Sequence, residues 1–142
     1  MITIEEKYRV HKVLYHEIED KYPELYEEIF NEVADTRQVP NYVYLSYLGE
    51  ECVAMITAYI HNTDTVYMQI GGVKGKYRGY RTLDIFRQLL DLIHEDFPNI
   101  ICRVLNTHTS ALKLMLGVGM IIIGIRLDGS LLYVEFMKIK EE

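Results

Sequence analysis

The stretch from Val73 to Arg81 reads VKGKYRGYR and carries the residues with the clearest chemical meaning in this sequence. It follows an apolar run that ends at Val73 and precedes an amphipathic segment that begins near Thr82. Glycines and basic side chains between a strand and the start of a helix present backbone N–H groups to a phosphate. Only Asp84 opposes the basic residues of this region, which are Lys74, Lys76, Arg78, Arg81 and Arg87. In a protein of net charge −6, this local positive field predicts an anionic ligand, and a solvated turn is the alternative.

Alternating apolar residues on both sides of this loop predict the elements that hold it in place. Three strands joined by hairpin turns are expected at residues 42–48, 52–60 and 65–73. A helix from Thr82 to Glu95 buries its apolar side, and Pro98 stops it. The loop therefore lies between the third of these strands and the helix.

The rest of the chain adds a strand at residues 100–105, a short helix at 110–116 and a closing hairpin at 120–139 with an Asp-Gly turn. Residues 4–35 are predicted to form two helices that meet near Pro23, because apolar residues recur there every three to four positions. The many acidic side chains of this segment are expected on a solvated helix face.

A strand, a crossover helix and a second strand imply that residues 66–73 and 100–105 lie parallel with a right-handed connection. The hairpins on either side imply antiparallel neighbours. We therefore expect one α/β domain over residues 1–142. Its central sheet is mixed and mostly antiparallel, with a parallel crossover pair and helices on both faces.

This order of elements, together with Val73-x-x-x-x-Arg78-Gly79 in the crossover, resembles the GNAT superfamily of N-acetyltransferases over residues 40–140. In that family the loop reads V-x-P-x-x-Q/R-G/R-x-G-x-G/A, and it holds the pyrophosphate of acetyl-CoA. Gly75 stands where the family has proline, which still permits a turn. The resemblance implies the α/β fold of the family, with acetyl-CoA as the cofactor.

The two signature glycines of the family's loop fall on Arg81 and Leu83. An arginine at position 81 can fold outward and bond the phosphates itself, or it can mean that cofactor binding has been lost. The resemblance also implies that the end of the third hairpin strand pairs with the pantetheine arm, and that Thr82 caps the following helix. The cofactor contacts that it assigns are Gly71, Gly72, Val73, Lys76, Arg78, Gly79, Tyr80, Arg81 and Thr82.

Catalytic roles follow from the same resemblance. The family's general acid, a tyrosine in the last helix, falls on Met115, whose side chain has no proton to donate. Asp64 is the carboxylate near the start of the strand that leads to the loop, so it is a candidate general base, with turn formation as the alternative. His108, just before the last short helix, is a candidate base or proton relay, with a plain loop residue as the alternative.

The expected acceptor is a primary amine in a protein, a peptide or a small molecule. Tyr59, Tyr67 and Gln69 are candidates to line its cleft, and cross-strand packing is the alternative for the two tyrosines. The first predicted function is acetyl-CoA-dependent N-acetyl transfer. A catalytically silent GNAT-fold module with a structural or binding role is the alternative, which the missing glycines and the missing tyrosine favour.

Composition narrows the class of protein and its compartment. A net charge of −6 argues against a general nucleic-acid binder, and no apolar run reaches the length of a membrane span. Residues 1–6 lack the basic and apolar regions of a signal peptide. Cys52 and Cys102 lie in apolar strand patterns without metal-ligand spacing, so we expect buried thiols in a cytoplasmic protein without a metal. The closing hairpin is apolar on both faces, which predicts burial in the fold or a homodimer.

Overall fold

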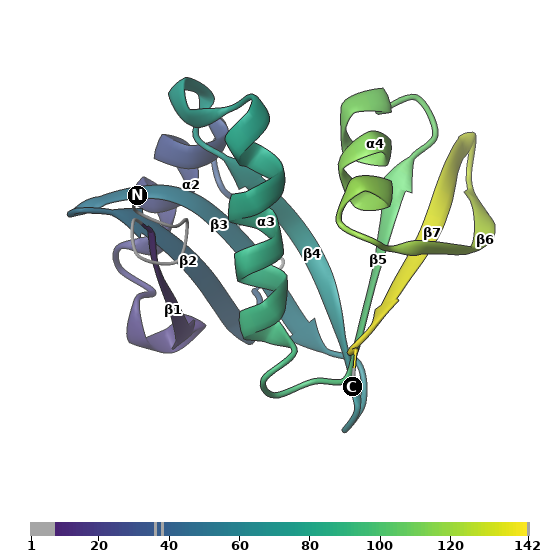
Figure 1. Cartoon of the computed structure of the whole chain (residues 1–142), viewed down its shortest axis with the longest axis horizontal. Coiled ribbons are helices and arrows are strands. Elements are labelled where there is room, and N and C mark those ends of the chain that lie inside the picture. Colours follow the sequence, from purple (N-terminus) through teal and green to yellow (C-terminus); the bar gives the residue numbers. More distant parts are fainter. Residues whose placement is uncertain (1–7, 36, 38, 142) are drawn as a thin grey trace.

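The computed structural model describes residues 8–35, 37 and 39–141, and its strands form one seven-stranded sheet (Figure 1). The strands are β1 (Tyr8–Leu14), β2 (Tyr42–Leu48), β3 (Glu51–Ile60), β4 (Thr65–Val73), β5 (Asn99–Leu105), β6 (Ile121–Asp128) and β7 (Leu131–Ile139). Their order across the sheet is β1-β2-β3-β4-β5-β7-β6. β4 and β5 are parallel, and the other neighbouring pairs are antiparallel. The predicted mixed sheet with a parallel crossover pair is confirmed.

Helices cover both faces of this sheet. They are α2 (Tyr22–Phe30), α3 (Tyr80–Ile93) and α4 (Thr109–Gly117), with short 3₁₀ turns η1 (Tyr15–Glu17) and η2 (Gly75–Tyr77). α3 and α4 pack on one face, where Phe86 and Met115 belong to the same buried cluster. α2 packs on the other face, where Ile29 is buried against Val43 and Met55. No helix in the described part of the chain is both long and apolar enough to cross a membrane.

The N-terminal segment differs from the sequence-based prediction. Residues 8–14 form β1, an edge strand antiparallel to β2, and the helix expected there is absent from the described residues. The rest of that predicted helix, residues 4–7, lies outside the described range. Val10 packs on the α3 side of the sheet and Val13 on the α2 side. A spacing of three that indicates a helix therefore arises here from a strand that buries residues on both faces.

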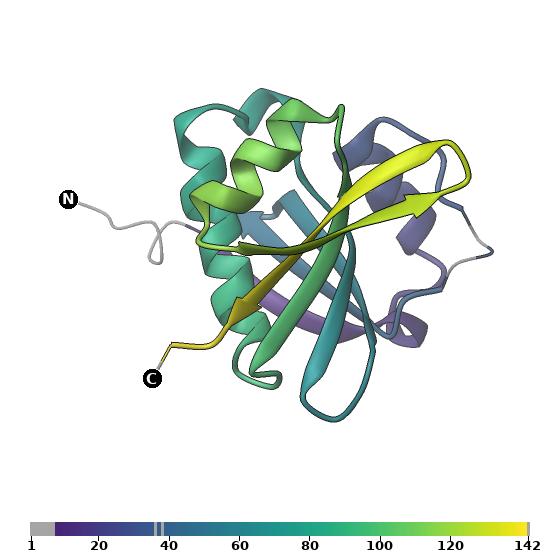
Figure 2. The same ribbon diagram turned by 90° about the vertical axis from the view of Figure 1, so that its right-hand side faces the viewer.

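β4 and β5 separate soon after they begin. Their parallel pairing consists of Thr65–Asn99, Val66–Ile100 and Tyr67–Ile101. Beyond Tyr67 the two strands diverge toward the ends from which α3 and α4 follow (Figure 1). Figure 2 shows the β6–β7 hairpin nearest the viewer, on the opposite side of the sheet from β1. The second half of β4 therefore pairs with β3 along one edge. Its other edge faces the space between the diverging strands β4 and β5.

Candidate functional site

The diverging part of β4 ends in the residues that the sequence predicts to approach a cofactor. Residues 71–73 pair with β3 through Ile56, Met55 and Ala54. The ladder between β3 and β4 shifts register at Thr57, so that Gln69 is an extra residue in β4. Such a bulge bends a strand and re-aims its side chains. The register shift lies just before Gly71 and Gly72.

Gly71 and Gly72 are required by the helices that pack on them. A Cβ added to Gly71 would lie 2.6 Å from the ring of Phe86 of α3, and one added to Gly72 would lie 2.6 Å from the ring of Phe30 of α2. Each glycine thus accommodates an aromatic ring on its own face of the sheet. This packing accounts for both residues, and it leaves their backbone along the open edge of β4.

The lysines of the loop are neutralised by carboxylates from other elements. Lys74 Nζ lies 2.7 Å from Glu28 Oε1 and 2.7 Å from Glu51 Oε2, and Lys76 Nζ lies 3.1 Å from the same Glu51 oxygen. The Tyr77 hydroxyl donates to Glu51 Oε1 at 2.6 Å. Hydrogen bonds from Lys74, Tyr77 and Lys76 together lower the pKa of Glu51 to about 2. The prediction that only Asp84 opposes the basic residues was therefore wrong, because Glu28 and Glu51 reach the loop from α2 and β3.

The remaining part of the loop leads directly into α3. Val73 is buried, and its carbonyl accepts a hydrogen bond at 2.9 Å from Nε of Arg78, which folds the loop back on the strand. Gly79 has φ 125° and ψ −143°, a conformation that is almost confined to glycine, and it is the N-cap of α3. Tyr80 begins the helix, so Thr82 is its third residue and not the predicted N-cap. The Gly79 N–H donates to the Thr82 hydroxyl at 3.0 Å.

The start of α3 is the strongest anion-binding feature of this face. The first turn of a helix has N–H groups without partners inside the helix, and its dipole favours negative charge. No acidic residue lies in the first turn of α3. The guanidinium groups of Arg78 and Arg81 lie on either side of Gly79 in the sequence and add formal positive charge. The start of α3 with its two arginines is therefore better suited to bind a phosphate than the loop lysines, which are paired with carboxylates.

The candidate acid and bases lie apart from one another. Met115 of α4 is buried, and its sulfur lies 3.7 Å from the Cys102 sulfur, so the residue that replaces the family's tyrosine belongs to an apolar cluster. His108 is the exposed N-cap of α4, beyond the end of β5. Asp64 is exposed in the turn before β4, where its backbone N–H bonds to Asn62 Oδ1 at 2.9 Å. The Asp64 carbonyl accepts from the Asn99 N–H at 3.0 Å at the start of β5, whereas His108 follows the other end of that strand. The strand between them spans roughly 20 Å, so the structure does not bring Asp64 and His108 together.

The α2 face of the sheet gathers the predicted acceptor residues. The rings of Tyr59 and Tyr67 stack with their centroids 4.8 Å apart. Arg103 of β5 donates from Nε to the Tyr67 hydroxyl at 3.0 Å, and its guanidinium lies 5.0 Å from the centroid of the Tyr133 ring. Tyrosines from β3, β4 and β7 and an arginine from β5 thus form a continuous row beside the point where β4 and β5 separate.

A small pocket lies on the same face, against the β4 bulge. Its volume is about 140 Å³, and its lining comprises Tyr22, Tyr26, Asp35, Gln69 and Ile70. The Arg37 side chain donates to Asp35 at 3.0 Å and lowers the pKa of that carboxyl, which therefore stays ionised. Both Asp35 oxygens are paired with Arg37, so the Tyr22 and Tyr26 rings are the groups here that can attract an ammonium ion. The pocket can therefore receive an amine next to Gln69.

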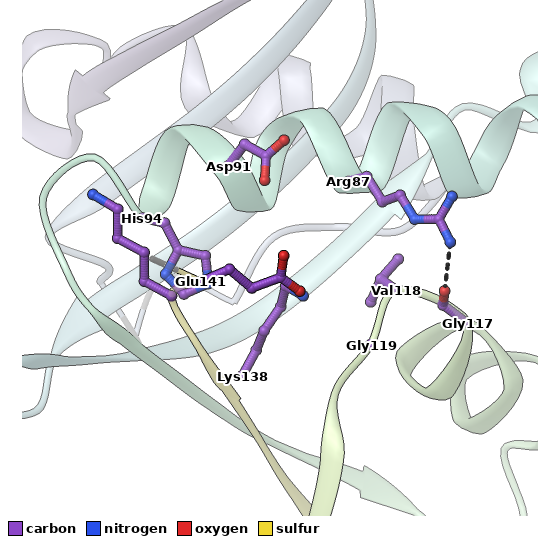
Figure 3. Close-up of a pocket in the computed structure, with 9 residues that line it drawn as sticks. Arg87, Asp91, His94, Gly117, Val118, Gly119, Lys138 and Glu141 are labelled. Carbon is purple, nitrogen blue, oxygen red and sulfur yellow. Dashed lines mark hydrogen bonds between the residues drawn. The ribbon is translucent and has the colours of Figure 1, made fainter.

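A larger cavity of about 530 Å³ lies along the second half of α3 (Figure 3). Arg87 and Asp91 of α3 line it together with His94, the C-cap of that helix. The end of α4 at residues 117–119 and the residues Lys138, Lys140 and Glu141 near the end of β7 complete the lining. Arg87 spans it by donating to the Gly117 carbonyl at 3.0 Å (Figure 3). Because it lies away from the first turn of α3 and mixes acidic with basic groups, this cavity is separate from the loop site.

Several residues of the candidate site were not foreseen from the sequence. Asp35, Arg103 and Tyr133 come from a loop and from two strands that follow the crossover. Their only sequence signal is alternation, which places Arg103 and Tyr133 on one face of their strands once the strands are paired. The register of β4, β5 and β7 is what brings them together.

No protein-family model matches this sequence, and no curated protein matches it. Solved structures, however, share its fold. Ard1 from Thermoplasma volcanium is 13% identical, with a TM-score of 0.69 over 96% of this chain and 99% of that one. A GNAT family acetyltransferase from Elizabethkingia anophelis with acetyl-CoA bound is 15% identical, with a TM-score of 0.64 over 96% and 100%. Arabidopsis thaliana Naa50 in complex with the bisubstrate analogue CoA-Ac-MVNAL is 17% identical, with a TM-score of 0.65 over 93% and 98%. The chain therefore has the GNAT fold.

Proposed function

We propose that this protein transfers an acetyl group from acetyl-CoA to a primary amine. The observation that carries the proposal is the separation of β4 and β5 after Tyr67–Ile101, with the first turn of α3 following directly from the end of β4. The same fold holds acetyl-CoA in the Elizabethkingia anophelis acetyltransferase. The divergence provides a strand edge, and the helix provides an anion-binding end.

Backbone groups at the edge of β4 and at the start of α3 are suited to bind the two polar parts of acetyl-CoA. The open edge of β4 offers N–H and C=O groups to the amides of a pantetheine arm. The α3 N-terminus, with Arg78 and Arg81, would hold the pyrophosphate, and the absence of a side chain on Gly75 and Gly79 leaves open space around them. When bound, acetyl-CoA supplies an activated acetyl thioester, whose acetyl group passes to the amine as the thiol is released.

On the other face, the acceptor amine would enter beside the β4 bulge. The Tyr22 and Tyr26 rings attract it as an ammonium ion, and it must lose a proton before it can attack a carbonyl carbon. Asp35 is not suited to deprotonate it, because hydrogen bonds from Arg37 lower the pKa of the Asp35 carboxyl. Asp64 and His108 remain predictions for the proton transfer.

A catalytically silent GNAT-fold module is the second candidate. The observation that favours it is the buried Met115, which packs against Cys102 where the family has its proton-donating tyrosine. Without an acid, the reaction depends on how well the thiolate departs unaided. Acetyl-CoA binding without turnover is the behaviour expected of such a module.

Thermal unfolding with and without acetyl-CoA tests the binding step. A ligand at 100 times its dissociation constant stabilises the folded state by about 2.7 kcal/mol. We expect a saturable rise in Tm with acetyl-CoA and with CoA, and none with pantetheine, which lacks the phosphates. An unchanged Tm at millimolar acetyl-CoA would reject the proposal. If Tm rises but no thiol is released with a panel of primary amines, the silent module is the correct function.

We also propose that the protein forms a homodimer through β6. Five side chains of this edge strand are more than half exposed, namely Ile121, Ile122, Ile123, Ile125 and Leu127. The opposite edge, β1, carries Arg9, His11 and Lys12, charged or polar groups that discourage strand pairing. Of the two edge strands formed by the described residues, β6 is therefore the apolar one. A second copy of the same strand, antiparallel across a twofold axis, would pair its backbone and cover its side chains.

A further inference from the structure

Arg103 is held in one position by two aromatic side chains. It belongs to β5, two residues after the last pair between β4 and β5. Its Nε donates to the Tyr67 hydroxyl at 3.0 Å, and its guanidinium carbon lies 5.0 Å from the centroid of the Tyr133 ring. Arg103 is also partly buried. These contacts fix the guanidinium before any ligand arrives, which reduces the entropy that binding would cost.

The charge of Arg103 is not neutralised by an ion pair within the described part of the chain. The hydrogen bond with Tyr67 raises the pKa of Arg103, and Asp128 at the end of β6 is the carboxylate whose charge adds to this rise, but it forms no salt bridge with Arg103. Glu135 lies directly opposite Arg103 in the β5–β7 ladder. The two do not form a salt bridge, and the Glu135 carboxylate lies toward Gly124 of β6, where an added Cβ would be 3.5 Å from its Oε1. Four of the five N–H donors of the guanidinium therefore remain for another group.

The Tyr67 hydroxyl adds a further donor to this site. Because it accepts a hydrogen bond from Arg103, its own proton is left to donate. Burial raises the pKa of Tyr67, so the hydroxyl keeps that proton at neutral pH. The stacked ring of Tyr59, with its centroid 4.8 Å away, packs against the Tyr67 ring and supports its position. Adjacent guanidinium and hydroxyl donors are suited to the two oxygens of a carboxylate.

We infer that Arg103 and Tyr67 bind a carboxylate of the acceptor, so that the acceptor is a small molecule with both a primary amine and a carboxylate. The inference rests on the proposed acetyl transfer. Tyr67 precedes Gln69 by two residues, roughly 7 Å along β4. An acceptor with its amine beside Gln69 and its carboxylate at Arg103 must therefore have several bonds between these two groups. An amino acid whose amine is at the opposite end of the carbon chain from its carboxylate has this form. The pocket of about 140 Å³ suits the small end of such a molecule.

Acetyl transfer to two matched acceptors tests this specificity. 5-Aminopentanoate and 5-aminopentanamide differ only in whether the group distant from the amine is charged. Loss of charge-assisted hydrogen bonds costs about tenfold or more in affinity, so Arg103→Gln should lower kcat/KM by that factor for the carboxylate and leave the amide nearly unchanged. Arg103→Lys, which keeps the charge but loses the fork, should give an intermediate loss. Arg126→Gln is the control, because Arg126 lies opposite Tyr133 in β6 and carries the same charge on the same face.

A binding measurement gives a readout that does not depend on turnover. The Nε–Hε signal of Arg103 can be assigned in a ¹H–¹⁵N spectrum by its loss in Arg103→Lys. We expect it to shift saturably with 5-aminopentanoate at millimolar concentration and not with 5-aminopentanamide.

The two failures are distinguishable. A saturable Arg103 shift without thiol release would leave the carboxylate site standing and reject acetyl transfer. Turnover that favours neither acceptor, or an Arg103 signal that does not respond to the carboxylate, would reject the carboxylate site and leave the proposed function intact.

Discussion

The backbone N–H of Gly79 donates a hydrogen bond at 3.0 Å to the hydroxyl of Thr82 in the first turn of α3. Gly79 is in a conformation that side chains resist, with φ 125°, and this bond fixes the direction in which the loop enters the helix. The position of the helix start therefore depends on two residues within the loop that the sequence predicts to bind phosphate. A change at either residue should affect both folding and cofactor binding.

Replacing Thr82 with valine removes the acceptor of that bond while keeping a branched side chain of similar size. Loss of a helix-end hydrogen bond costs about 0.5–2 kcal/mol, so Thr82→Val should lower the free energy of unfolding by about that amount. Thr82→Ser keeps the hydroxyl and should stay close to the unchanged protein. Urea unfolding followed by circular dichroism measures both, and equal losses in the two variants would contradict the role of the hydroxyl.

Arg81 tests whether the loop still binds pyrophosphate without the family's glycine. Hydrogen bonds to charged groups contribute about 1.5–3 kcal/mol, so Arg81→Ala should weaken acetyl-CoA at least tenfold, with a steep dependence on salt. Arg81→Gly restores the family's residue and should be tolerated. Isothermal titration at two salt concentrations measures both effects. If neither variant changes the affinity for acetyl-CoA, the start of α3 does not bind the phosphates.

The sheet from β2 to β7 could be predicted because each strand has a local signal. Alternation and turn residues locate those strands within about one residue of their observed ends. β1 could not be predicted this way, because Val10 and Val13 are partly buried on opposite faces and their spacing imitates a helix. A local pattern of apolar residues indicates which side chains are buried, but not whether they lie on one face of the element or on two.

The electrostatics of the site could not be predicted from a local window. Lys74 and Lys76 appear unopposed in the sequence, yet Glu28 and Glu51 reach them from elements that are distant along the chain. Arg103, in contrast, has no special local signal, and its role depends on Tyr67 and Tyr133 in neighbouring strands. Both outcomes are set by tertiary contacts.

Variants at Gly71 can separate its role in packing against α3 from a role in cofactor binding. Gly71→Ala would place a methyl group 2.6 Å from the buried Phe86 ring, and such overpacking costs about 1–3 kcal/mol. Phe86→Leu should relieve it, so the double variant should be more stable than the sum of the single effects predicts. Urea unfolding of all four proteins gives the coupling energy. A double variant that regains stability but still fails to bind acetyl-CoA would assign Gly71 a second role along the open edge of β4.

Glu51 should make stability depend on pH in a defined window. Its pKa falls from an ordinary value of 4.5 to about 2 in the folded protein, chiefly through hydrogen bonds from Lys74 and Tyr77. A carboxyl with a lowered pKa stabilises the fold above its unfolded value, and this contribution is lost as the pH falls through the folded value. Glu51→Gln should therefore destabilise the protein at neutral pH, and the difference should vanish between pH 4.5 and about 2. Urea unfolding across this range measures it, with Glu50→Gln as the exposed control outside the network; a difference that stays constant with pH would contradict the assignment.

The apolar edge of β6 predicts an assembly that one charged residue can prevent. Ile125 is 68% exposed on this strand, and a lysine there would bring like charges together across a twofold axis, which disfavours strand pairing. Light scattering at micromolar concentration should give twice the chain mass of 16.7 kDa for the unchanged protein and a single chain mass for Ile125→Lys. Val33→Lys is the matched control, because Val33 is 88% exposed but lies outside the sheet and should leave the dimer intact. A single chain mass for the unchanged protein would show that β6 is not covered by a second copy.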